Sequence, residues 1–289
     1  MPRLAALILL AAALALPQAA TAQQQRPAGT PAAPPPSAKP QPPQRLAPPA
    51  ARVTTPPTRY SEMPPDAAYR DCIGFAQRDP ENGFEAAITW RDEGGGPQAR
   101  HCVAVALVGL GQFAEAAERL EILAIEMAAY PPQARAQVVG LATRAWLGAG
   151  RLTRAFATAT EALHLDPDNV DLLLDRGEVL ANAERYWDAL DDFNRATTLA
   201  PKRVDALVLQ AAAHRLVEAH DLARDDIARA LALAPDSPEA LVELGKIRRA
   251  DGDSVGAREA WKRTIAVAPD SPAAIAAQRG IEQLELAGR

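Results

Sequence analysis

Four short sequences, each ending in proline, decide the fold of this 289-residue chain: HLDP (164–167), TLAP (198–201), ALAP (232–235) and AVAP (266–269). Their prolines, at 167, 201, 235 and 269, are 34 residues apart each time. Each sequence lies between two Ala-rich amphipathic runs. Proline ends a helix because it lacks a backbone N–H and its ring clashes with the preceding turn. The spacing therefore predicts a repeating helical unit that stops at each proline.

Small residues recur at fixed places between these prolines. When proline is counted as position 32 of the unit, the small residues are at position 8 (Thr143, Gly177, Ala211, Gly245), position 20 (Ala155, Ala189, Ala223, Ala257) and position 27 (Ala162, Ala196, Ala230, Thr264). Bulkier residues occupy position 4 (Val139, Leu173, Leu207, Leu241) in every unit. Over residues 136–271 this pattern resembles the tetratricopeptide repeat (TPR) family.

The resemblance implies an all-α fold, a right-handed superhelical solenoid of stacked helix-turn-helix hairpins. We expect four repeats over residues 136–271 and degenerate TPR-like hairpins over residues 66–135. The first degenerate hairpin has its expected turn at Asn82–Gly83, and the second at Gly111. Residues 272–289 are predicted to form a capping helix and tail, because their polar residues suit the outer face of a solenoid end.

The N-terminal residues differ from the repeats in composition. Residues 1–22 combine Arg3, a 13-residue apolar core (Leu4 to Leu16) and Ala20-Thr21-Ala22, which together predict a cleaved signal peptide. The apolar core is too short to cross a bilayer comfortably, but an uncleaved anchor stays open as an alternative. We therefore expect an exported chain, periplasmic in a bacterium with an outer membrane, with no integral membrane span after cleavage.

Residues 23–65 are predicted to be a disordered linker. They contain 14 prolines in 43 residues and too few large apolar side chains to offset the entropy of ordering. Five basic residues and one acidic residue give this segment a net charge of +4. The chain from residue 66 onward has 25 basic and 35 acidic residues, a net charge of −10.

Composition and motif context argue against several function classes. A net charge of −5 argues against a nucleic-acid binder, and 2 cysteines with 4 histidines are too few for a zinc-ligand array, so we expect neither a metal nor a cofactor. GLGQFA (109–114) matches a dinucleotide-binding outline, and GDSVG (252–256) matches a nucleophile elbow. Both, however, place a glycine at the turn of the repeat, and no histidine follows Ser254 to act as its base. We therefore expect no enzymatic activity.

Cys72 and Cys102 are the two cysteines of the chain. Each lies in the predicted first helix of one of two adjacent hairpins, and such helices are neighbours in a solenoid. An even number of cysteines in an exported chain favours a disulfide between them. The alternative is a pair of buried thiols that act as small apolar residues.

The TPR resemblance also implies a binding groove along the first helices, at positions 2, 5, 9, 12 and 13 of each repeat. The candidate groove residues are three apolar and five charged side chains: Leu174, Val208, Val242, Arg144, Glu178, Arg215, Lys246 and Arg249. The three cations at the C-terminal end are expected to cluster. The alternative for the apolar three is that they pack inside the helix pair.

A groove of this kind suits an amphipathic helix or an extended segment of another protein. The sequence therefore predicts an exported, non-enzymatic scaffold that binds a protein or peptide partner, in a role such as envelope assembly or secretion. A self-associating structural solenoid is the alternative.

Overall fold

A computed structural model describes residues 65–287 of the chain, and within them every regular element is a helix. The predicted signal peptide (1–22) and all but the last residue of the predicted linker (23–65) lie outside the described residues. The elements are α1 (Pro65–Arg78), α2 (Pro80–Asp92), α3 (Gly96–Gly109), α4 (Phe113–Glu126), η2 (Met127–Ala129), α5 (Pro132–Gly148), α6 (Leu152–Leu165), α7 (Val170–Asn182), α8 (Tyr186–Leu199), α9 (Val204–Leu216), α10 (His220–Leu233), α11 (Pro238–Ala250), α12 (Ser254–Val267) and α13 (Pro272–Ala287).

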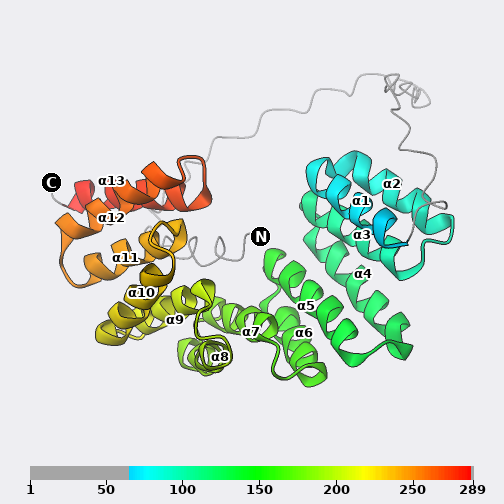
Figure 1. Ribbon diagram of the computed structural model, residues 1–289, viewed down its shortest axis with the longest axis horizontal. Helices are drawn as coiled ribbons and strands as arrows, with labels where there is room; N and C mark the ends of the chain where they lie inside the picture. Colours follow the sequence, from blue (N-terminus) through cyan, green and yellow to red (C-terminus); the bar gives the residue numbers. More distant parts are fainter. Residues whose placement is uncertain (1–64, 288–289) are drawn as a thin grey trace, which may run out of the picture. The chain divides into compact units, whose positions relative to one another are not determined.

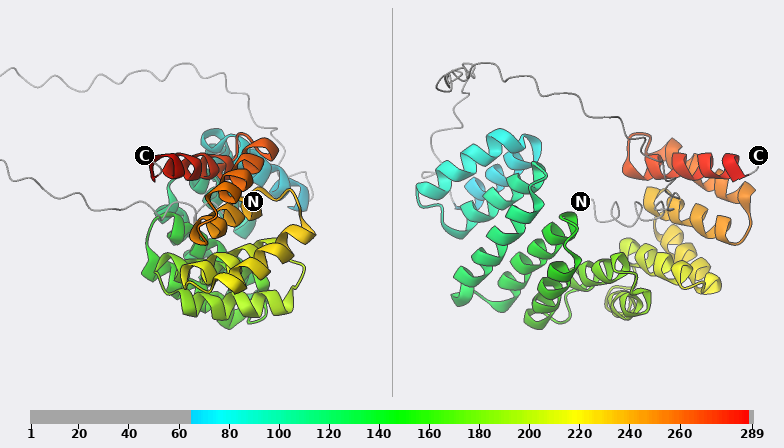
Figure 2. Two further views of the ribbon diagram at one scale, coloured as in Figure 1. Left: turned by 90° about the vertical axis from the view of Figure 1, so that its left-hand side faces the viewer. Right: turned by 180° about the vertical axis from the view of Figure 1, so that it is seen from behind.

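Consecutive helices pair as hairpins, from α1 with α2 to α11 with α12, and α13 covers the last pair (Figures 1 and 2). Each second helix also packs on the first helix of the next hairpin, as α6 does on α7 and α8 on α9. The first helices α5, α7, α9 and α11 contact one another in that order. This arrangement confirms the predicted all-helical solenoid of stacked hairpins.

The four prolines end the repeats as predicted. Helices α6, α8, α10 and α12 each stop two residues before proline, at Leu165, Leu199, Leu233 and Val267. After three of the four prolines the next helix begins at a capping side chain. Asn169 accepts hydrogen bonds from the backbone N–H groups of Asp171 and Leu172 (3.0 and 3.3 Å). Ser237 accepts one from Ala240 (3.3 Å), and Ser271 accepts one from Ala274 (3.1 Å). These caps satisfy N–H groups that have no partner within the helix.

The small residues of the repeat lie where helices approach most closely. All four alanines at position 20 are fully buried. A Cβ atom added at Gly177 would lie 2.3 Å from Cε1 of Phe193, and one added at Gly245 would lie 2.2 Å from Nε1 of Trp261. Both aromatic rings are buried. The glycine at position 8 therefore leaves the space that the aromatic ring at position 24 fills.

The two motifs that resemble enzyme signatures lie in hairpin turns, as the repeat register predicts. Gly111 of GLGQFA follows α3 and has φ +73°, and Gly252 of GDSVG follows α11 and has φ +83°. Glycine adopts this left-handed conformation at no steric cost. At the same turn position two other hairpins carry a glutamate, Glu184 and Glu218, with φ 59° and 61°.

The turn expected at Asn82–Gly83 is wrong. Both residues lie inside α2, and the turn is at Asp79, whose side chain accepts a hydrogen bond from the backbone N–H of Asn82 (3.3 Å). Pro80 starts the helix, a position that does not need its missing N–H. Gly83 serves packing instead, because a Cβ atom there would lie 2.5 Å from the Cα atom of Ala76 in α1.

Cys72 on α1 and Cys102 on α3 form a disulfide, with their Cα atoms 6.1 Å apart. Both residues are buried. The bond ties the first helices of the first two hairpins together. None of the described helices combines the length and the apolar character that crossing a membrane requires.

Candidate functional site

The candidate groove residues all lie on the first helices α5, α7, α9 and α11. In Figure 1 the first helices α3, α5 and α7 lie on the inner side of the curved stack, and α4, α6 and α8 lie on the outer side. We call the side formed by the charged candidates the inner surface: Arg144, Glu178, Arg215, Lys246 and Arg249. The structure places these side chains in three separate clusters.

The three apolar candidates do not form an open strip. Leu174, Val208 and Val242 have 0, 3 and 1% of their surface exposed. These side chains therefore pack between helices, which is the second of the two readings left open by the sequence. Position 5 of the repeat turns toward the neighbouring helix because the first helices contact one another directly. The inner surface is consequently polar. These three residues are too deeply buried to contact a partner directly.

The first cluster joins α5 to α7 through Arg144. Its guanidinium lies 3.6 Å from Oδ2 of Asp175, and that carboxyl is almost fully buried. Glu178, one turn further along α7, is also buried. On its other side Arg144 lies close enough to His101 of α3 to affect its titration. Burial first, and then the Arg144 charge, lower the pKa of His101 to about 4.

His101 itself extends this line of polar groups toward the N-terminus. Its Nδ1 atom is hydrogen-bonded to the hydroxyl of Tyr69 on α1. Polar side chains therefore run from α1 through α3 and α5 to α7. Sequence analysis assigned no role to His101, although the repeat register, counted back from Gly111, places it at position 5 of the second hairpin.

The second cluster joins α9 to α11 through Glu243, which is 3% exposed. Arg215 donates from Nε to Oε1 of Glu243 (2.5 Å), and Lys246 donates from Nζ to Oε2 (3.0 Å). Burial by itself would raise the pKa of Glu243, but the charges and hydrogen bonds of Lys246 and Arg215 outweigh it and lower the pKa to about 2. The carboxylate is thus ionised and holds two cations in fixed positions.

The third cluster contains Arg249, the last of the predicted cations. Its guanidinium donates to Oε1 of Gln283 on α13 (2.5 Å) and lies 5.9 Å from the centre of the Trp261 ring. Arg215 and Lys246 therefore come together as expected, while Arg249 turns toward the capping helix. Glu243 was missed by sequence analysis, although its place three residues before Lys246 on one helix was a usable signal.

Two of the other three histidines, His214 and His220, face a carboxylate. Nδ1 of His214 lies 2.8 Å from Oδ2 of Asp226, and Nδ1 of His220 lies 2.7 Å from Oδ1 of Asp251. Burial raises the pKa of Asp226, and the nearby His214 and Arg229 only partly oppose it. Within residues 65–287 no three His, Cys, Asp or Glu side chains lie close enough together to hold a metal ion.

Comparison with solved structures identifies the fold. A tetratricopeptide repeat protein from Parabacteroides merdae matches 74% of this chain and 83% of its own length, with 13% identity and a TM-score of 0.59. TTC0263, a TPR protein of Thermus thermophilus, matches 64% of this chain and 98% of its own (17% identity, TM-score 0.55). MamA from Desulfovibrio magneticus RS-1 matches 61% of this chain and 97% of its own length (20% identity, TM-score 0.50).

No protein-family model matches the sequence, and no curated protein is significantly similar to it. At these identities the structural matches show the fold alone. The chain has the TPR fold.

Proposed function

We propose that this TPR-fold chain is a non-enzymatic scaffold whose inner surface binds a protein segment rich in carboxylates. The observation that carries the proposal is the arrangement around Glu243. One buried carboxylate holds Arg215 and Lys246 in place. Arg249 lies one turn beyond Lys246 on the same helix and is held separately, by Gln283 of α13. Three cations and one anion give this part of the inner surface a net charge of +2, although residues 66–289 as a whole carry −10.

Preorganisation is what makes these cations suitable for binding. A free lysine or arginine loses side-chain entropy when it binds a carboxylate, and that loss weakens exposed ion pairs. Here the Glu243 carboxylate has already ordered Arg215 and Lys246, whose side chains are 19 and 21% exposed. Their remaining N–H groups therefore meet an incoming carboxylate with little further ordering.

Export is part of the same proposal. Disulfides persist in oxidising compartments and are rare in the bacterial cytosol. The Cys72–Cys102 bond therefore supports a chain that works outside the cytoplasm, in agreement with the predicted signal peptide. A partner in the cell envelope, engaged during assembly or secretion, fits that location.

The test is a double substitution, Lys246→Glu with Arg249→Glu, that keeps Arg215 as the cation paired with Glu243. Partners are cross-linked in the native host and quantified by mass spectrometry. We expect at least one partner to decrease about tenfold, which corresponds to about 1.4 kcal/mol of binding free energy. The matched control is Lys202→Glu with Lys262→Glu, which makes the same charge change in the turn before α9 and on the second helix α12. An unchanged set of partners contradicts the proposal.

Self-association is the second candidate function, and the outer side of α13 favours it. Ile275 and Leu286 on this last described helix are 54 and 69% exposed. A second copy of the chain would bury them. Replacing both with Ser should reduce the molar mass measured by light scattering at high concentration. A strict monomer at every concentration would exclude this candidate.

A further inference from the structure

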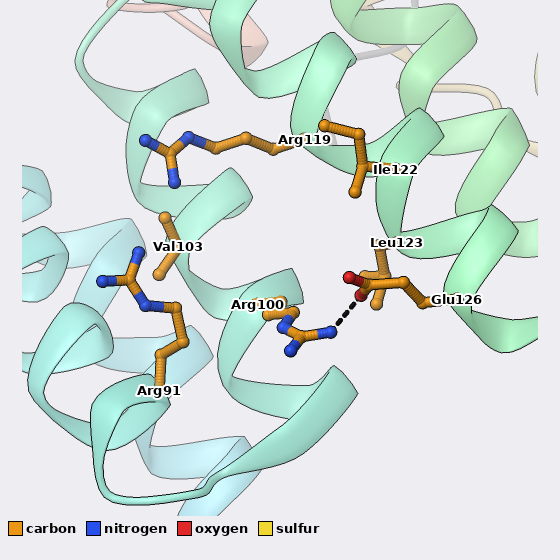
Figure 3. Close-up of a pocket in the computed structure, with 7 residues that line it drawn as sticks. All are labelled: Arg91, Arg100, Val103, Arg119, Ile122, Leu123 and Glu126. Atoms are coloured by element: carbon orange, nitrogen blue, oxygen red, sulfur yellow. Dashed lines mark hydrogen bonds and ion pairs between the residues drawn. The ribbon is translucent and has the colours of Figure 1, made fainter.

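A pocket of about 230 Å³ lies away from the inner surface, between α2 and α4 with α3 as its floor. It is lined by three arginines, three aliphatic residues and one glutamate: Arg91, Arg100, Arg119, Val103, Ile122, Leu123 and Glu126. Figure 3 shows the guanidinium groups of Arg91 and Arg119 converging on either side of Val103, with Arg100 turned toward Glu126. We propose that this pocket is a second binding site, for an acidic peptide segment that also carries a large apolar side chain.

The first argument is the distribution of charge across the pocket. Arg91 comes from α2 and Arg119 from α4, so two cations face each other across one groove. In the next groove along the stack, between α4 and α6, the facing helices form an ion pair instead. Arg154 of α6 donates to Glu121 of α4 (2.7 Å). The facing helix thus supplies the anion in that groove. Between α2 and α4, Arg91 and Arg119 each pair only with a carboxylate of their own helix, and Glu126 pairs with Arg100 of α3, so no ion pair joins the two facing helices.

The second argument is that the carboxylates now paired with these arginines are easily replaced. Arg119 pairs with Glu115 (2.7 Å), Arg91 with Asp92 (2.8 Å), and Arg100 with Glu126. In each pair both side chains are about one third to three fifths exposed. Exposed ion pairs of this kind contribute little stability. A ligand carboxylate can therefore take over a guanidinium and bind it in the bidentate geometry that arginine favours.

The third argument is the apolar part of the pocket. Val103 and Leu123 are each 1% exposed and form its floor, while Ile122 stands at its wall with 56% of its surface exposed. A ligand that offered charge alone would leave Ile122 in water. A Leu or Ile side chain next to the carboxylates would bury it.

The predicted linker of this chain is not the occupant. Residues 23–65 carry a net charge of +4, and three arginines in the pocket would repel them. Charge complementarity therefore points to a partner segment with adjacent Glu or Asp and an aliphatic residue.

The test uses purified full-length chain and a fluorescein-labelled peptide, Ser-Gly-Leu-Glu-Glu-Leu-Gly-Ser, with fluorescence anisotropy as the measurement. The twin peptide has Gln in place of both Glu residues. We expect the acidic peptide to bind and the twin to bind at least about tenfold more weakly. Arg91→Gln and Arg119→Gln should each weaken binding about threefold, and added salt should weaken it further.

The most informative variant is Glu126→Gln, which frees Arg100 from its present partner. We expect it to tighten peptide binding about threefold, because the ligand no longer competes with Glu126. Glu118→Gln is the matched control, since it removes the same charge from an exposed position of α4 outside the pocket. A merely structural role of the Arg100–Glu126 pair would not produce tighter binding.

Several results would overturn the proposal. They are equal binding of the two peptides, unchanged binding in Arg91→Gln and Arg119→Gln, no difference between Glu126→Gln and Glu118→Gln, and binding of vesicles of anionic phospholipid but not of the peptide. Lys246→Glu with Arg249→Glu separates this site from the inner surface. If that variant abolishes peptide binding, the peptide occupies the inner surface and the pocket proposal fails, while the proposed function does not.

Discussion

The joint between α1 and α3 and the joint between α9 and α11 occupy equivalent places in the solenoid but are held by different chemistry. Both connect the first helices of two successive hairpins. The N-terminal joint is covalent, through Cys72 and Cys102. The C-terminal joint is ionic, through Arg215, Glu243 and Lys246. The same backbone arrangement therefore does not dictate which interaction connects the first helices of neighbouring hairpins.

The two joints respond to different conditions. A disulfide is insensitive to pH in the acid range but is broken by a reductant. The ionic joint withstands a reductant but depends on the ionisation of one buried carboxylate. The N-terminal hairpins depart from the repeat register. They are joined by the disulfide, which depends less on precise packing than the ionic joint does.

The largest expected effect is on the ionic joint. Glu243→Gln should lower the free energy of unfolding at pH 7 by about 3 kcal/mol, the value of a pKa shift from 4.5 to about 2. Because the folded pKa is lowered, this stabilisation is complete above about pH 4.5 and is lost as the pH falls through 2. Urea unfolding at several pH values between 7 and 2 measures the difference in the free energy of unfolding between the variant and the wild type.

The difference in the free energy of unfolding between wild type and Glu243→Gln should stay constant from pH 7 to about pH 4.5 and narrow below it. Glu259→Gln, at an exposed position of α12, is the control and should change stability by less than about 0.5 kcal/mol. If both variants lose the same stability at every pH, the ionic joint has no special contribution.

The next effect is on the covalent joint. Replacing both Cys72 and Cys102 with Ala should cost about 2–4 kcal/mol, because the bond closes a loop with a sequence separation of 30 residues. Hydrogen exchange should show faster exchange in α1, with α7 to α12 unchanged. Reductant should reproduce the effect in the wild type and do nothing to the variant. Uniformly faster exchange along the whole chain would show that the two joints are not independent.

The smallest expected changes in stability come from replacing a helical glycine by alanine, once in α7 of the repeats and once in α1 of the N-terminal hairpins. Gly177→Ala should destabilise by about 1–3 kcal/mol, because its Cβ would lie 2.3 Å from the buried ring of Phe193. Gly74→Ala in α1 should stabilise by about 0.5–1 kcal/mol, because the nearest atom, 3.1 Å away, belongs to the mobile end of Arg78. Thermal unfolding of the two variants checks the opposite signs. Adding Phe193→Leu to Gly177→Ala should recover part of the loss.

Repeat spacing predicts most of the fold but only part of the candidate site. Helix stops before the four prolines, and turns at Gly111 and Gly252, follow from local backbone preferences and were predictable. The turn at Asn82–Gly83 was not, because the same dipeptide also fits the first turn of a helix that starts at Asp79-Pro80. Local sequence signals of equal strength competed, and the close contact of Gly83 with Ala76 decided between them.

For the inner surface, prediction from the sequence failed for a different reason. The register placed Arg215 and Lys246 on adjacent first helices, and they do meet. It did not tell whether the side chains at position 5 would line the groove or pack between helices. Leu174 is buried by contacts that come from neighbouring helices, and the repeat pattern does not contain those contacts.

The sequence by itself determined the length of the repeat, the helical hairpins and the places where helices stop, because these depend on residues near one another along the chain. The two cysteines in adjacent first helices also favoured the covalent joint. Only the tertiary structure decided which charges are buried, how the ionic joint forms, and where a pocket opens. Glu243 lies 28 residues from Arg215, and Glu126 lies 26 residues from Arg100. The desolvation and ion pairing of such groups depend on atoms brought together by the stacking of hairpins, which no local pattern contains.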